Sequence, residues 1–139
     1  MDKYYTPQIE DFHVGFEFEF ETGIEGWKKF TLENDRIDAT LRNVKDFPTQ
    51  FRVKYLESND VESLGWKKMI WKFEDKIVEF FGINETGEYL HPYEAELTIL
   101  KGNRIKISKG EFSQITFIIK NKCELKTLMN QLNITKHEN

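Results

Sequence analysis

The chain has 139 residues, of which 39% are hydrophobic and 32% are charged, and its formal net charge is −4. This balance is typical of a globular protein and excludes a disordered one. A chain of this length can bury one ordinary hydrophobic core, so we expect a single domain over residues 1–139. The single cysteine, Cys123, excludes an intrachain disulfide. The chain also starts without the apolar segment of a signal peptide and contains no apolar run that could span a bilayer, so we expect a cytoplasmic protein.

Charge is distributed unevenly along the chain. Residues 1–26 contain seven acidic residues and one lysine, whereas residues 101–136 contain eight basic residues and two glutamates. The two ends could attract each other across the fold, or the basic part could stay free for an anionic ligand. The net negative charge gives no strong signal for nucleic acid, because nonspecific DNA binding needs many exposed cations.

The first half of the chain predicts strands. Residues Val14–Glu21 alternate apolar residues with glycine and glutamates, which predicts one apolar and one acidic face. A turn over residues 22–26 precedes an expected return strand, Trp27–Leu32, which could place Lys28 or Lys29 opposite the glutamates. Three further elements are expected: a short helix over Asp35–Lys45, a strand over Phe51–Leu56 and a helical turn over Ser58–Gly65.

Residues Trp66–Phe81 fit two alternatives. Apolar residues spaced by four and three are typical of an amphipathic helix. Residues 69–73 and 77–81 could equally form two strands around a turn at 74–76. Beyond this segment we expect a hairpin and one further strand, over Tyr93–Leu100, Arg104–Ser108 and Phe112–Ile119.

The last helix is the clearest helical prediction. Asn121 can cap it, Glu124 follows three residues later, and Asn133 can end it. Its apolar stripe comprises Leu125, Leu128, Met129 and Leu132. Together the elements predict an α+β fold with a mainly antiparallel, twisted or barrel-like sheet of about five to seven strands and the C-terminal helix packed on its apolar face.

Five segments carry a resemblance to known proteins: Tyr4–Pro7, Glu10–Glu19, Val53–Leu56, Asp60–Trp66 and Ile118–Lys126. In this order they resemble a group of uncharacterised small proteins encoded by phages and prophages of gut bacteria. The resemblance covers most of the chain, and residues 74–100 are the least similar. It implies no activity and no site, only the context of a phage or mobile-element accessory protein.

Lysines at the start of the last helix predict a candidate anion site. Lys120, Asn121 and Lys122 lie where a strand passes into a helix, so free backbone N–H groups and two ammonium groups would converge there. Arg104 and Lys106 would add to this basic face if the hairpin that contains them packs nearby. A solubilising face beside a helix cap explains the same residues.

Aromatic residues are a second candidate site. Tyr4, Tyr5 and Trp66 could contact a nucleobase or a protein surface, although such rings more often belong to the core.

A third candidate uses acidic residues. His13, Glu17 and Glu19 share one face of the first strand and are plausible metal ligands. Residues two apart on a strand are separated by roughly 6–7 Å, so only neighbours could share one ion. A solvated acidic face paired with lysines explains the same pattern.

We therefore expect a non-enzymatic binding protein. It would be an accessory factor that sequesters an anionic, nucleotide-like small molecule or inhibits a host protein. One alternative is a protein–protein interaction module without a small-molecule ligand, and another is a small metal-dependent hydrolase or nuclease. No catalytic residue, metal, cofactor or membrane partner is expected, and homo-oligomerisation stays open.

Lys120→Ala combined with Lys122→Ala tests the anion site. Loss of two positive charges should weaken binding of inorganic phosphate and reduce the dependence of the remaining affinity on ionic strength. Calorimetric titration with phosphate at low and high salt measures both quantities. An unchanged affinity in the double variant would contradict the predicted site.

Overall fold

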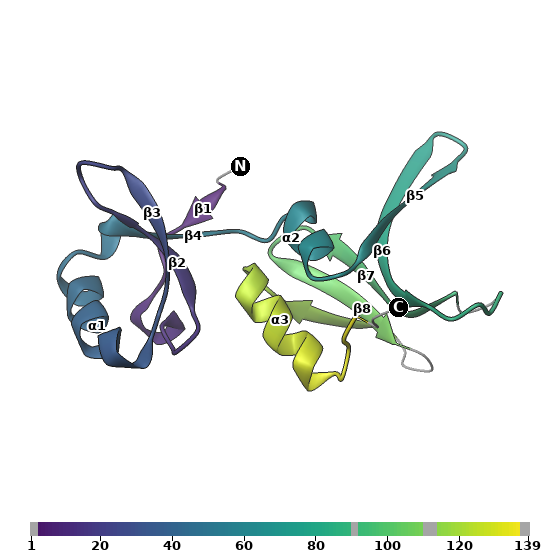
Figure 1. The fold of residues 1–139 in the computed structure, drawn as a ribbon. Helices are drawn as coiled ribbons and strands as arrows, with labels where there is room; N and C mark the ends of the chain where they lie inside the picture. Colours follow the sequence, from purple (N-terminus) through teal and green to yellow (C-terminus); the bar gives the residue numbers. More distant parts are fainter. Residues whose placement is uncertain (1–2, 90–91, 110–113, 137–139) are drawn as a thin grey trace. The chain divides into compact units, whose positions relative to one another are not determined.

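The chain divides into two compact units, Met1–Tyr55 and Leu56–Asn139, which we call unit 1 and unit 2 (Figure 1). Each unit has a hydrophobic core of its own, and each is described by itself. A single domain over residues 1–139 stays a prediction. The structure is a computed structural model, and it describes residues 3–89, 92–109 and 114–136.

Unit 1 contains a four-stranded antiparallel sheet with the strand order β1-β4-β2-β3. Its core contains mostly phenylalanines, with Val44 of the single α-helix among them. In chain order the elements are β1 (Tyr4–Tyr5), η1 (Ile9–Asp11), β2 (Glu17–Glu21), β3 (Trp27–Thr31), η2 (Asn34–Arg36), α1 (Ile37–Asp46), η3 (Pro48–Gln50) and β4 (Phe51–Lys54).

The predicted alternation of the first strand is present in β2. Phe16 and Phe18 are buried and Phe20 is half-buried, so the apolar face lies against the core. Val14 is 56% exposed because it precedes the strand, at a turn in which Gly15 has a φ of +91°. The return strand is also confirmed, and its register places Lys29 directly opposite Glu19.

Unit 2 contains a five-stranded antiparallel sheet with the strand order β5-β6-β7-β8-β9. In chain order its elements are α2 (Ser58–Ser63), β5 (Lys67–Phe73), β6 (Lys76–Glu85), β7 (Tyr93–Leu100), β8 (Arg104–Lys109), β9 (Ile115–Ile118) and α3 (Lys122–Gln131). Residues 112 and 113 of the last predicted strand lie outside the described residues.

The ambiguous segment Trp66–Phe81 forms a hairpin rather than a helix. β5 and β6 pair from Lys67↔Gly82 to Phe73↔Lys76, around a turn in which Glu74 has a φ of +54°. Pairing with β7 decides the outcome, because it buries Phe81 in the core of unit 2. A helix over the same residues would leave β7 without that neighbour.

Helix α3 packs on the sheet of unit 2, as predicted. Leu125 and Leu128 share one core with Phe81 and Leu97 of the sheet. The side-chain oxygen of the N-cap residue, Asn121, accepts a hydrogen bond of 2.9 Å from the backbone N–H of Glu124. The helix cap is therefore confirmed.

The predicted α+β class is confirmed. Both sheets are antiparallel, and a C-terminal helix packs on the second. The strands of the described residues belong to two sheets, of four and five strands, and neither closes into a barrel. The predicted single sheet of about five to seven strands differs from these two sheets because β4 pairs with β1 and β2 of unit 1.

Gly82→Ala tests a close approach within unit 2. A β-carbon at Gly82 would lie 2.6 Å from Cγ of the Tyr93 ring, closer than van der Waals contact allows. We expect Gly82→Ala to lower the free energy of unfolding by roughly 1–3 kcal/mol through overpacking. Urea denaturation measures this cost in the wild type and in a Tyr93→Ala background, where it should be smaller. Equal costs in both backgrounds would contradict the clash.

Candidate functional site

A pocket of about 570 Å³ lies in unit 1, within the size range of sites for small molecules. It lies between the sheet and the segment formed by η2 and α1. Its lining residues are Phe18, Phe20, Lys29, Phe30, Thr31, Leu32, Glu33, Arg36, Thr40, Asn43 and Phe51. Side chains from β2, β3, η2, α1 and β4 therefore contribute to one cavity.

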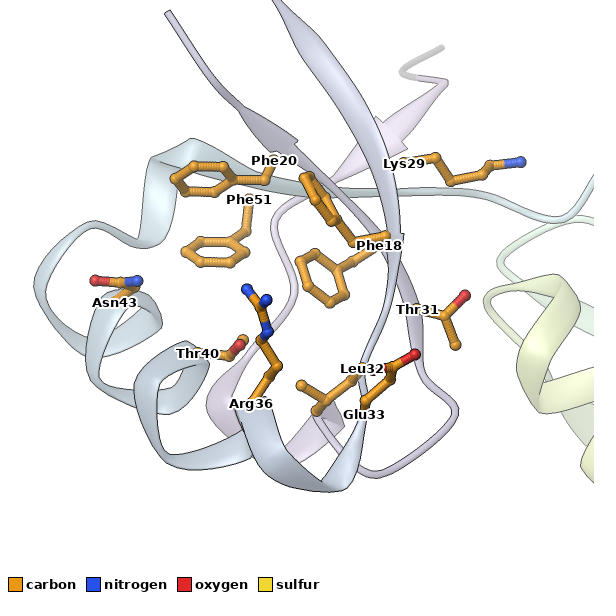
Figure 2. Close-up of a pocket in the computed structure, with 11 residues that line it drawn as sticks. Phe18, Phe20, Lys29, Thr31, Leu32, Glu33, Arg36, Thr40, Asn43 and Phe51 are labelled. Atoms are coloured by element: carbon orange, nitrogen blue, oxygen red, sulfur yellow. The ribbon is translucent and has the colours of Figure 1, made fainter.

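Phenylalanine rings form the apolar part of the pocket (Figure 2). The period of two along β2 places Phe18 and Phe20 on the same face. Cross-strand pairing then places Phe30 opposite Phe18 and Phe51 opposite Phe20. The ring centroids of Phe20 and Phe51 lie 5.0 Å apart, and those of Phe18 and Phe51 lie 5.7 Å apart. Phe18 and Phe51 are buried, so the aromatic surface on which a flat ligand could stack comes mainly from Phe20 and Phe30.

Three polar side chains border the same pocket. Arg36 ends η2, and Thr40 and Asn43 follow at spacings of four and three, on one side of α1. In Figure 2 the guanidinium group of Arg36 points toward the rings of Phe18 and Phe51. Among the described residues it has neither a hydrogen bond nor an ion pair. Arg36 is thus available to pair with an anionic group of a ligand.

The remaining charged residues of the pocket point elsewhere. In Figure 2 the ammonium group of Lys29 and the side chain of Glu33 point away from the phenylalanine rings. The positive charge at the rings therefore comes from Arg36. This combination suits a ligand with an apolar body and one anionic group.

The three predicted anion-binding residues at the start of α3 do lie together. However, Asn121 is 4% exposed, and its side-chain oxygen is used as the helix cap. The backbone N–H of Lys120 donates a hydrogen bond of 2.8 Å to Oε1 of Glu124. The chain thus places one of its own carboxylates beside the N–H groups that an external anion would use. Lys120 and Lys122 still place two ammonium groups there, and the site stays a prediction.

The other two predicted residues lie on β8. Arg104 pairs with Ile118 and Lys106 pairs with Thr116, on the side of the sheet opposite the buried Ile105. The Nε of Arg104 donates to the carbonyl oxygen of Lys101 at 2.9 Å. Ile118, the residue opposite Arg104, is two residues before Lys120 in the chain, whereas Thr116, the residue opposite Lys106, is four residues before it.

Tyr4 and Tyr5, two of the predicted aromatic contacts, pack against different residues of unit 1. The guanidinium of Arg52 lies 3.8 Å from the centre of the Tyr4 ring and 4.3 Å from that of Trp27. The rings of Tyr5 and Tyr55 are 4.8 Å apart.

Trp66 is a core residue. It is 3% exposed, and its indole nitrogen lies 3.3 Å from the sulfur of Met129. The expectation that it contacts a partner is therefore corrected. Trp66 comes directly after Gly65 and directly before β5. Its ring lies in the core of unit 2, among residues of the sheet and of α3.

Glu19, in the middle of the acidic face of β2, forms an ion pair within unit 1. Oε1 of Glu19 lies 3.0 Å from the guanidinium nitrogen of Arg52. His13 lies before the strand, where Nδ1 is 3.0 Å from the carbonyl oxygen of Val14. Within the described ranges no group of three potential metal ligands comes together.

Comparisons of the chain with protein-family models, with curated proteins and with solved structures find no match. None of the helices in the described part of the chain has the length and apolarity needed to cross a membrane. Function is therefore argued from the geometry of the pocket.

Arg52→Lys tests the cluster around Glu19. Lysine keeps the charge but loses the planar group that stacks on Tyr4 and Trp27, so we expect a loss of about 1 kcal/mol in the stability of unit 1. Chemical denaturation followed by tryptophan fluorescence measures it. Arg42→Lys, at an exposed position of α1, is the matched control and should leave stability unchanged. Equal stability of the two variants would contradict this role for Arg52.

Proposed function

We propose that this chain is a non-enzymatic binding protein whose unit 1 pocket holds a small molecule with an apolar, preferably aromatic, body and one anionic group. The observation that carries the proposal is the guanidinium of Arg36, which faces a wall of phenylalanine rings without a partner among the described residues (Figure 2). A mononucleotide and an aromatic carboxylate share this chemistry.

The expected binding energy has two parts. Stacking on the rings contributes about 0.5–1.5 kcal/mol for each aromatic pair, beyond the apolar area that is buried. The anionic group would form a charge-assisted, bidentate hydrogen bond with Arg36, which also fixes the orientation of the ligand. Thr40 and Asn43 supply further donors at the rim of the pocket. The rings thus supply affinity, and the polar side chains select an anion.

The proposed setting is that of an accessory protein of a phage or mobile element. The resemblance of five segments to phage and prophage proteins supports this setting. In that setting the protein would act in the cytoplasm and sequester its ligand from the host. The pocket is partly open to solvent, as expected for a site that exchanges ligand reversibly.

Arg36→Gln tests the proposal. We would titrate the protein with 1-anilinonaphthalene-8-sulfonate, an aromatic anion whose fluorescence rises on binding, and compete it with adenosine monophosphate. Loss of the guanidinium should weaken binding about fivefold, because a partly exposed ion pair contributes about 1 kcal/mol. Affinity of the wild type should fall as salt rises, and that of Arg36→Gln should change less.

Two controls make this result specific. Arg42→Gln removes the same charge from α1 outside the pocket and should bind the probe like the wild type. Trp71→Ser removes an exposed aromatic ring of unit 2 and shows how much probe binds there. Equal affinity of Arg36→Gln and Arg42→Gln would overturn the pocket as the binding site.

A further inference from the structure

The β5–β6 hairpin of unit 2 exposes an apolar face. Trp71 and Phe73 are 65% and 70% exposed, and Val78 is 49% exposed. The register places Trp71 opposite Val78 and Met69 opposite Phe80, so these side chains and Phe73 share one face. The ring centroids of Trp71 and Phe80 are 6.0 Å apart, in agreement with this arrangement. Such a cluster is unusual on a protein surface that faces only water.

The same hairpin supplies the edge of the sheet. β5 is the first strand in the order β5-β6-β7-β8-β9 and pairs with β6 on one side only. Every second residue of an edge strand directs its backbone N–H and C=O groups outward. In Figure 1 the turn end of the hairpin extends beyond the helices and the other strands of unit 2. A long edge strand without cover is a template for pairing with another strand, and the lysines of β5 (Lys67, Lys68 and Lys72) favour a partner that presents acidic groups to them.

We propose that β5 pairs antiparallel with β5 of a second copy of this chain, about a two-fold axis at Trp71. β5 ends at Phe73, and Glu74 and Asp75 form the turn that leads into β6. This register therefore pairs residues 69–73 of the two copies, and it brings the acidic turn of each copy next to Lys67 and Lys68 at the start of β5 in the other. Because the axis repeats this arrangement, basic and acidic groups face each other at both ends of the interface. This inference goes beyond the pocket of unit 1 and does not depend on it.

The apolar residues agree with the same register. Trp71 lies opposite its own symmetry mate, and Met69 lies opposite Phe73. Directly opposed residues on one face are about 5 Å apart, so these large side chains cover one another across the interface. The intrachain ion pairs Lys67–Glu85 and Lys68–Glu79 are long, at 3.9 and 3.7 Å, and leave the lysines free to reorient.

The neighbouring registers are less favourable. A two-fold axis perpendicular to the sheet keeps each face on its own side, so the axis must pass through a residue. Centred on Ile70, the pairing places Lys68 opposite Lys72. Centred on Lys72, it places two like charges at the axis itself. Centred on Met69, it places Lys67 and Lys68 opposite apolar residues and away from the acidic turn. Centred on Trp71, it places Lys72 opposite Ile70, but it also brings Lys67 and Lys68 next to Glu74 and Asp75, which favours this centre.

Charge reversal in the full-length chain tests the proposal, with sedimentation velocity as the measurement. Lys67→Glu with Lys68→Glu, and separately Glu74→Lys with Asp75→Lys, should each raise the dimer dissociation constant at least about tenfold, because like charges then face each other. The variant with all four changes should dimerise within about threefold of the wild type, because the pairs are restored with opposite sign. Circular dichroism confirms that each variant is folded.

Lys101→Glu with Lys126→Glu changes the same net charge at exposed positions outside β5 and should leave dimerisation unchanged. A wild type that stays monomeric at about 0.5 mM would overturn the proposal, including the case in which the hairpin binds a different protein. The proposal would also be overturned if the variant with all four changes stays monomeric while the wild type dimerises.

Discussion

Each sheet is covered mainly by one ten-residue helix, to which the shorter α2 adds Val61 in unit 2, and this limited cover shapes both units. In unit 1, α1 contributes Val44 to the core, and in unit 2, α3 contributes Leu125 and Leu128. A ten-residue helix such as α3 is about 15 Å long, whereas a ten-residue strand such as β6 is about 33 Å long. One helix therefore cannot cover the full length of such a strand. Apolar side chains beyond its reach stay exposed unless a ligand or another chain covers them.

Both functional proposals concern apolar residues that this cover leaves exposed. Along β6, Phe81 is 2% exposed in the core, whereas Val78 and Ile77, nearer the turn, are 49% and 65% exposed. In unit 1 the ring of Phe51 is 3% exposed, whereas that of Phe30, at the pocket, is 41% exposed. The transition from core to exposed apolar surface occurs along β6 in unit 2 and between β4 and β3 in unit 1. A gradient of this kind is typical of a binding surface that continues directly from the core.

Polar residues that share a strand need not form a site. The acidic face of β2 and the aromatic start of the chain were separate candidates in the sequence, yet Arg52 of β4 contacts both Glu19 and Tyr4. Its Nε is buried and has no hydrogen-bond partner among the described residues. The guanidinium of Arg52 stacks on the rings of Tyr4 and Trp27, which shield the cation, and the carboxylate of Glu19 compensates its charge. The cluster therefore acts within unit 1 as a polar link between strands.

The sequence by itself determined the elements that local patterns specify. Alternation identified the strand that ends at Glu21, and the Asn121 cap with its apolar stripe identified α3. Both signals depend on neighbours a few residues apart, which the printed chain shows directly. For Trp66–Phe81 the helical and strand periods both fit, and pairing with β7 selected the hairpin. The division into two sheets likewise arose from long-range pairing.

Tertiary structure alone decided the candidate site. Arg36, Thr40 and Asn43 have an ordinary helical spacing, and nothing in the sequence distinguishes them from a solvated face. They border a pocket only because α1 packs beside phenylalanines from three strands. Similarly, the exposure of Trp71 depends on the register of the β5–β6 hairpin, which places Trp71 on the face opposite the buried Phe81. The pocket is defined by residues that are distant in sequence, and their meeting depends on packing rather than on local pattern.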